Sequence, residues 1–302
     1  MNTKKKSPGN TVAFKKEFVK TYAPSHITGF FAICDHTDPL YKGSIGCGIV
    51  LEAGCVTEVS LGNNLPVRAR IKINGVEEEA PTTRYVVELL AGTAAVCVAT
   101  NFEVPVGCGF GASGAGALST ALALNELLSL SMTLNEVAQV AHRAEVENRT
   151  GLGDVMAETN GGVVIRRKPG PPGIGMIYRI PYTNENISYV VFGPKLTKAV
   201  LAEGGEELKR QISGAGKNAL KALMRKPTIE TFMRVSRDFS LRSGLMSDTC
   251  KDAIEAVDAE GKVASVAMIG EAVFVIGDSE ALKEFGEVKR SRISDVGVKI
   301  IY

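Results

Sequence analysis

Hydrophobic and polar residues in the first third of the chain follow the two-residue period of β-strands. Segments 45–59 and 67–73 are rich in β-branched residues and are bounded by glycine, asparagine and proline, so we predict two strands joined by the turn LGNNLP. The segment 84–100 alternates less cleanly. We interpret it as a helix that leads into a strand, with a boundary that the pattern does not place.

Helical periodicity dominates the middle of the chain. Residues 113–130 carry apolar side chains at helical spacing, many of them alanines that permit close packing. The next helix is predicted to begin after Thr133, which lies three positions before Glu136, the spacing of a capping box. The segment GGVVIRRK, residues 161–168, then predicts a strand.

The second half of the chain repeats this mixed pattern. The segment PGPPGIG, residues 169–175, is dense in proline and glycine, and we place a lobe boundary or a long loop there. Helices are predicted near 195–212, 215–238 and 247–259, and short strands near 188–193, 263–267 and 272–276. This alternation predicts an α+β second lobe.

Composition narrows the class of partner. The 302 residues are 45% hydrophobic, which is enough to fill the core of one or two packed units. The net charge of +2 is too balanced for a nucleic-acid-binding surface, and tryptophan is absent. We therefore expect a small-molecule partner and no nucleic acid.

Cysteine spacing and apolar runs indicate the compartment. The six cysteines form no CxxC pair and no cluster with zinc-ligand spacing, which predicts free thiols. No apolar run reaches the ~18 residues of a spanning helix, and the basic start MNTKKKSPGNTVAFKKEFVK lacks the apolar segment of a signal peptide. We expect no membrane association and a cytoplasmic location.

The most unusual stretch is PVGCGFGASGAG, residues 105–116, which places five glycines directly before a predicted helix. Glycine lets a ligand approach the main chain, and the first turn of a helix offers unpaired N–H groups with a partial positive charge. The stretch therefore predicts an anion site, with phosphate as the leading occupant.

Three interpretations of this stretch compete with one another. A P-loop requires lysine and then serine or threonine, but Gly116 is followed by alanine and leucine, which excludes it. The dinucleotide pattern G-x-G-x-x-G matches at Gly109, Gly111 and Gly114, yet no acidic residue follows about 20 positions later at a strand end. A glycine-rich turn needed only for close helix packing is the third interpretation.

A more specific match is to a known family. Residues 105–115 resemble the P-x-G-x-G-L-G-S-S-A-A loop of the GHMP kinases, with Phe110 in place of leucine and Ser113 at the position of the second serine. The resemblance implies that the loop wraps the phosphates of ATP and that Ser113 reaches phosphate and Mg²⁺. The loop residues assigned to ATP are Pro105, Gly107, Gly109, Gly111, Ala112, Ser113 and Gly114.

Two further segments support the resemblance, and a third departs from it. The segment APSHITGFFAI, residues 23–33, aligns with the first family motif but has His26 in place of its lysine. The segment 144–162 resembles the motif that carries a metal-binding glutamate and a catalytic aspartate, here Glu145 and Asp154. The third motif, usually glycine-rich, has lost most of its glycines in residues 263–276.

Within this superfamily, the forms SHITGFF, TGLGDVMAE and VAMIGEAVF resemble the archaeal pantoate kinase branch. The resemblance implies transfer of phosphate from ATP to the C4 hydroxyl of (R)-pantoate, giving 4-phosphopantoate on the way to coenzyme A, and it suggests a homodimer. It also implies a two-lobed α+β fold with a ferredoxin-like C-terminal lobe. The expected division is a basic extension at 1–20, an ATP-binding domain at 21–168 and an α+β domain at 169–302.

The resemblance assigns roles to individual residues. Asp154 would orient or deprotonate the acceptor hydroxyl, although an aspartate there is also typical of a helix start. His26 would donate to Asp154 or to substrate, as a second catalytic group. Glu145, with Ser113, would hold Mg²⁺, although a solvated surface carboxylate is its default interpretation. The candidates for binding pantoate are Ser25, His26, His142 and Arg166.

Three points stay open at this level. Strand parity leaves Arg167 as an alternative to Arg166 for the substrate carboxylate. The acceptor alcohol could instead be homoserine or mevalonate, because one phosphate apparatus serves many acceptors. A nucleotide-binding sensor without catalytic activity is the alternative from another class, to which the degenerate third motif points.

Overall fold

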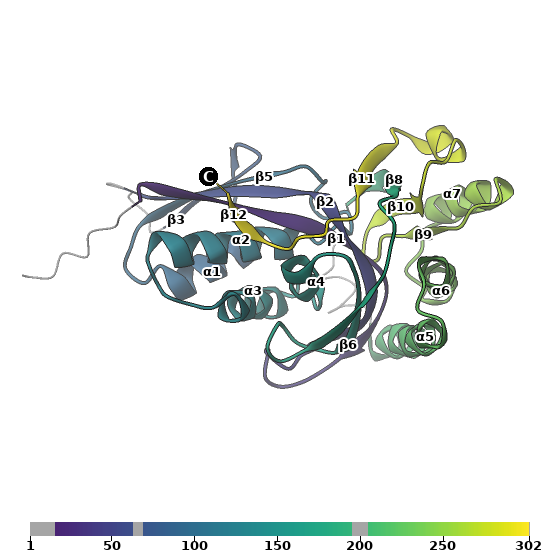
Figure 1. The fold of residues 1–302 in the computed structure, drawn as a ribbon, viewed down its shortest axis with the longest axis horizontal. Helices are drawn as coiled ribbons and strands as arrows, with labels where there is room; N and C mark the ends of the chain where they lie inside the picture. The colour runs from purple at the N-terminus through teal and green to yellow at the C-terminus, as the bar shows by residue number, and fades with distance from the viewer. Residues whose placement is uncertain (1–15, 63–68, 195–204, 302) are drawn as a thin grey trace, which may run out of the picture.

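The computed structural model describes residues 16–62, 69–194 and 205–301. A larger sheet of eight strands occupies one end of the molecule (Figure 1). Its strands lie in the order β12-β1-β2-β5-β3-β4, with β6 also paired to β2 and β7 paired to β6. The strands are β1 (Phe18–Cys34), β2 (Gly43–Leu61), β3 (Ala69–Ile73), β4 (Val76–Glu77), β5 (Val96–Phe102), β6 (Val163–Lys168), β7 (Met176–Ile180) and β12 (Lys299–Ile301).

Four helices lie along one side of this sheet (Figure 1). They are α1 (Pro81–Leu90), α2 (Ala112–Leu127), α3 (Leu134–Asn148) and α4 (Asp154–Asn160). Helix α2 has small or apolar residues on nearly all sides, which allows it to be buried between the sheet and its neighbouring helices. Helix α3 begins with the expected capping box between Thr133 and Glu136.

A second, four-stranded sheet follows in the chain. Its strands are β8 (Asn186–Gly193), β9 (Ala264–Val266), β10 (Glu271–Ile276) and β11 (Lys289–Arg292), and its helices are α5 (Gly205–Arg225), α6 (Ile229–Arg242), α7 (Asp248–Ala259) and the short 3-10 helix η2 (Ala281–Phe285). The order β11-β8-β10-β9, antiparallel throughout, is the strand order of a ferredoxin-like sheet. This confirms the expected α+β fold.

Most predicted elements are present, but one helix boundary is wrong and several strands were not predicted. The segment 84–100 does contain a helix and a strand, with the boundary at 91–95. The helix break predicted between 212 and 215 is wrong, because α5 continues to Arg225. The helix ends just before Pro227, which cannot extend it. The 17-residue strand β1 was missed, as were the short strands β4, β7, β11 and β12. Residues 195–204 and most of the turn LGNNLP lie outside the described residues.

The proline- and glycine-rich segment 169–175 is a connection within the larger sheet, since it joins the antiparallel strands β6 and β7. The division of the chain at residue 168 stays a prediction. Of the basic extension at 1–20, residues 1–15 lie outside the described part, and β1 already begins at Phe18. None of the six cysteines, all of which lie in the described ranges, is in a disulfide bond. Within the described ranges no helix is long and apolar enough to cross a membrane.

The two larger hydrophobic clusters of the described residues stabilise this arrangement. One fills the space between α1, α2, α3 and the larger sheet. The other joins the far ends of β1, β2 and β6 to the smaller sheet and to helices α5, α6 and α7. The glycine-rich segment, whose Phe110 and Ala112 belong to this second cluster, therefore lies where the two halves of the molecule meet, and α4 packs against α2 and β1.

Candidate active site

The glycine-rich segment connects β5 to α2 and has the geometry of an anion-binding loop. Gly107, Gly109 and Gly111 have φ values of 79°, 89° and 65°, a region that favours glycine. Gly111 is the N-cap of α2, and no side chain caps the first turn of that helix. The N–H groups of this turn are thus open to a ligand.

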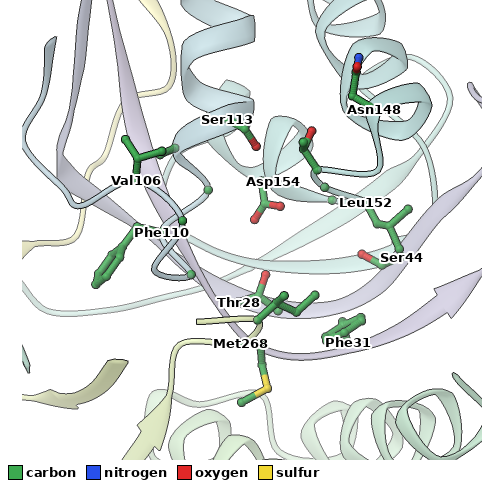
Figure 2. A pocket seen from close by; sticks show the side chains of 18 of the residues that line it. Thr28, Phe31, Ser44, Val106, Phe110, Ser113, Asn148, Leu152, Asp154 and Met268 are labelled. Atoms are coloured by element: carbon green, nitrogen blue, oxygen red, sulfur yellow. The ribbon is translucent and has the colours of Figure 1, made fainter. Parts of the chain in front are cut away.

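A cavity of about 460 Å³ lies against this loop. Gly107, Gly109, Gly111, Ala112 and Ser113 line it, as expected for residues assigned to ATP. Pro105 and Gly114 are not among its lining residues, so their assigned contact with ATP stays a prediction. Figure 2 shows the Ser113 hydroxyl and the Asp154 carboxylate directed into one space, with the Thr28 hydroxyl opposite them.

Asp154 is the first residue of α4 and is held by a neighbouring histidine. Its Oδ1 lies 2.8 Å from Nδ1 of His26, a ring that is fully buried in β1. The Asp154 side chain keeps 21% of its surface exposed, on the cavity side. The carboxylate is therefore fixed from behind and accessible from the front.

Arg166 of β6 completes a buried row of three charged or polar groups. Its Nη1 lies 3.4 Å from Nε2 of His26, and its Nη2 lies 3.5 Å from the hydroxyl of Thr28. Because arginine only donates, His26 Nε2 is the acceptor in this contact and Nδ1 carries the proton that is donated to Asp154. Arg166 also lines the cavity, whereas Arg167 is exposed on the other face of β6.

These contacts decide the charge of each group. Burial lowers the pKa of His26 despite the hydrogen bond to Asp154, so the ring is neutral at pH 7. Burial alone raises the pKa of Asp154, but the hydrogen bond from His26 and the charge of Arg166 hold it below its ordinary value. Asp154 is thus an ionised carboxylate with a fixed orientation.

Glu145 of α3 is fully buried and faces the phosphate loop. Its Oε1 accepts hydrogen bonds from Ser113 Oγ at 2.5 Å and from Thr150 Oγ1 at 2.8 Å. Burial and the nearby Asp154 raise its pKa from 4.5 to about 8, even though both hydroxyls favour the charged form. The interpretation of Glu145 as a solvated surface residue is therefore wrong.

Glu158, four residues after Asp154 on α4, is a third carboxyl group in this region. Both of its oxygens are buried without a hydrogen-bond partner. A Cβ added at Gly114 would lie 2.8 Å from Glu158 Oε2 and 3.1 Å from Glu145 Oε2, so both carboxyls face this point of α2. Burial, together with Asp154 and Glu145, raises the pKa of Glu158 well above its ordinary value.

Two of the residues predicted to bind substrate lie elsewhere. The Ser25 hydroxyl donates to the carbonyl of Ala53, away from the cavity lining. The ring of His142 lies 2.9 Å from the carbonyl of Lys42 and is also absent from the lining. His26 contacts the cavity only through Asp154, Thr28 and Arg166. Of the four candidates, Arg166 is the one that reaches the cavity directly.

The sequence interpretation missed several residues of the site. Thr28 and Glu158 had a usable signal, because Thr28 lies two residues after His26 on a strand and Glu158 lies four residues after Asp154 on a helix. Other lining residues come from loops or from strand ends and carry no such periodic signal. They include Phe31, Ser44, Thr150, Leu152, Met268 and Ile269.

Comparison with known proteins agrees with this geometry. Residues 82–162 match the family model for the GHMP kinases N terminal domain. The chain is 34% identical over 289 residues to a pantoate kinase from Methanospirillum hungatei, covering 94% of this chain and 96% of that protein. It is 35% identical over 274 residues to a pantoate kinase from Thermococcus kodakarensis, covering 88% and 90%.

A solved structure is similar over the same extent. A phosphotransferase related to the CoA biosynthesis pathway superposes with a TM-score of 0.84 at 30% identity, covering 94% of this chain and 98% of that one. The phosphate loop, the glutamate beside Ser113 and the aspartate at the start of α4 all lie inside the region that the family model matches. The chain belongs to the pantoate kinase family, within the GHMP kinases.

Proposed function

We propose that this chain transfers the terminal phosphoryl group of ATP to the C4 hydroxyl of (R)-pantoate, forming 4-phosphopantoate for coenzyme A synthesis. The observation that carries the proposal is the shared cavity: the open first turn of α2, the ionised carboxylate of Asp154 and the guanidinium of Arg166 all line it. Phosphoryl transfer requires a held triphosphate, charge neutralisation and an acceptor hydroxyl in line.

The phosphate end of the cavity is built from main chain. The N–H groups of the loop and of the first turn of α2 would bind phosphate oxygens, and the helix dipole favours their negative charge. Ser113 adds a hydroxyl that already lies in the cavity lining. Because this part of the site is preformed by glycine geometry, it would orient the triphosphate without reorganisation.

The carboxyl groups beside this loop fit a magnesium ion. Glu145 and Ser113 offer two hard oxygens in contact with each other, and the unpartnered oxygens of Glu158 and the raised pKa of Glu145 both indicate uncompensated carboxyl groups. No cluster of three or more metal-ligating side chains occurs among the described residues. Mg²⁺ commonly takes one or two protein ligands and completes its shell with phosphate and water. When bound, it would supply neutralisation of phosphate charge.

The acceptor end suits a small hydroxy acid. Arg166 is buried with its Nε unpartnered, and its planar fork could bind both oxygens of a carboxylate. Thr28 and Ser44 offer hydroxyls in the same lining. Asp154, held in orientation by His26, would then accept the proton of the reacting hydroxyl, a role worth about 10²–10⁴-fold in rate.

The other two functions account less well for this arrangement. A sensor without activity would need no ionised carboxylate fixed at the cavity edge, and Asp154 is fixed there by a buried histidine. Homoserine also has a carboxylate, but binding it at Arg166 would bring the adjacent cationic amino group close to the buried guanidinium, which would repel it. Mevalonate has a carboxylate as well, so the acceptor assay must include it.

Measurement of ADP release with Mg-ATP and each of pantoate, homoserine and mevalonate tests the proposal. We expect turnover with pantoate and weak or no turnover with the others. Asp154→Asn should lower kcat about 10²–10⁴-fold while ATP affinity stays nearly unchanged. Asp248→Asn is the matched control, because Asp248 is an exposed first residue of α7. Turnover with no alcohol, or a fully active Asp154→Asn variant, would contradict the proposal.

The cytoplasmic location and the homodimer stay predictions. Cysteines without disulfide bonds are compatible with a reducing compartment. The oligomeric state is measured directly by light scattering of the purified chain, with a mass near twice 32.0 kDa expected for the dimer.

A further inference from the structure

The turn between β9 and β10 contributes Met268 and Ile269 to the cavity lining and is anchored at two points. The N–H of Met268 donates to the carbonyl of Thr28 on β1 at 3.0 Å. A Cβ added at Gly270 would lie 2.1 Å from the carbonyl oxygen of Cys108, so the turn is in direct contact with the phosphate loop. This turn is the segment that the GHMP kinase pattern expects to be glycine-rich.

Ile269 in this turn has an unusual backbone conformation. Its φ is +58°, in the left-handed region, where a β-branched residue is an outlier and glycine or asparagine is the ordinary choice. The glycine of the turn, Gly270, has no positive φ and serves close packing instead. An observed backbone outlier of this kind motivates a search for function at that residue.

The position of Ile269 in the cavity suggests a role for its side chain in binding. Ile269 lines the cavity and is half-buried, whereas the turn residues on either side of it are buried. The side chain of Met268 points away from Asp154 in Figure 2. Met268 and Ile269 both line the cavity, and Ile269 is the more exposed of the two.

The acceptor end of the cavity has polar and apolar lining residues. Arg166, Thr28 and Ser44 provide the polar groups, and Phe31 and Leu152 join Ile269 in providing apolar surface. An acceptor that fits needs a carboxylate, hydroxyls and a compact apolar branch between them. Pantoate has this branch as two methyl groups on C3, directly beside the reacting C4.

We propose that Ile269 determines specificity by contacting the two C3 methyl groups of the acceptor, which selects a branched hydroxy acid over its unbranched analogue. The inference rests on the proposed function and deepens it. A residue held in a fixed, costly conformation against the substrate explains why the turn carries isoleucine where glycine would be easier to accommodate.

The test compares (R)-pantoate with (R)-2,4-dihydroxybutanoate, which lacks both methyl groups, in the full-length chain with Mg-ATP. Loss of a methyl contact in an apolar pocket is worth roughly 10–200-fold in kcat/KM. We expect the wild type to prefer pantoate by about 100-fold and Ile269→Ala to reduce that preference about tenfold. In Ile269→Ala, kcat/KM for pantoate should fall about tenfold more than kcat/KM for 2,4-dihydroxybutanoate.

Three further variants separate specificity from folding. Ile276→Ala truncates a half-buried isoleucine of the same hairpin that is absent from the cavity lining, and it should leave the preference unchanged. Ile269→Gly should also lose the preference for pantoate over 2,4-dihydroxybutanoate. Its midpoint of urea unfolding should be higher than that of Ile269→Ala, because glycine adopts the left-handed backbone conformation without strain. Ile269→Val keeps the β-branched shape and should show a smaller loss of preference.

The outcomes distinguish the inference from the function on which it rests. An unchanged preference in Ile269→Ala and Ile269→Gly, or an equal fall of kcat/KM for both acids, would overturn the role of Ile269 while leaving the kinase activity established. Failure of the wild type to phosphorylate either acid would overturn the proposed function, and this inference with it.

Discussion

Glu145 provides a quantitative test of the electrostatics of the site. Its carboxyl has a pKa of about 8 in the folded chain against an ordinary 4.5, because it is buried beside Asp154. A raised carboxyl pKa makes folding most favourable at acidic pH, and the contribution is lost as pH rises toward the folded pKa. Each pH unit in that window is worth about 1.4 kcal/mol.

Replacement by Glu145→Gln removes this titration and keeps an oxygen that can accept from Ser113. From about pH 5 to about pH 7.5, the free energy of unfolding of the wild type should fall by about 3 kcal/mol more than that of the variant. The assay is urea unfolding in the presence of EDTA at both pH values. Equal pH dependence of the two proteins would refute the assignment of a buried, uncompensated carboxyl to Glu145.

A control on the same helix should respond in the opposite direction. The pKa of Glu136 is lowered by hydrogen bonds from Thr133, so this carboxylate stabilises the fold above its unfolded pKa and loses that effect on acidification.

Binding of Mg-ATP gives a second readout of the Glu145 titration. A carboxylate must ionise to bind a metal, so the wild type near pH 7 should release most of one proton that Glu145→Gln does not release.

Two further substitutions test other parts of the site. Arg166→Met should raise the KM for pantoate about 100-fold with ATP affinity unchanged. The same change at its exposed neighbour, Arg167→Met, should have little effect. Equal effects of the two substitutions in a steady-state assay would argue against a carboxylate site at Arg166. Gly270→Ala should lower the free energy of unfolding by about 2 kcal/mol or more, since its Cβ would lie 2.1 Å from a backbone oxygen. Gly214→Ala, in the exposed interior of α5 with open space around it, should instead stabilise by up to about 1 kcal/mol in urea unfolding.

Local patterns in the sequence predicted the parts of the site that are local in the chain. The phosphate loop combines a run of glycines with an apolar helix, and its role follows from backbone chemistry that those residues impose. The capping box at Thr133 is equally local and is confirmed. Asp154 and Glu145 came from the family resemblance, and the structure places them beside Ser113 at the same loop.

The missed features depend on tertiary contacts. Strand β1 is buried on both faces along its middle, from Ala23 to Phe31 with few breaks, so it lacks the alternation that marks a half-exposed strand. His142 shares a helical face with Glu145, but its ring makes a hydrogen bond with the carbonyl of Lys42, which lies 100 residues away in the chain. Helical spacing cannot reveal such a partner.

The structure of the chain with a non-hydrolysable ATP analogue, Mg²⁺ and (R)-pantoate tests the central claim most directly. The account predicts the terminal phosphate on the first turn of α2, the C4 hydroxyl within hydrogen-bond distance of Asp154 and the pantoate carboxylate on Arg166. A triphosphate bound away from residues 105–113, or a C4 hydroxyl directed away from Asp154, would contradict it.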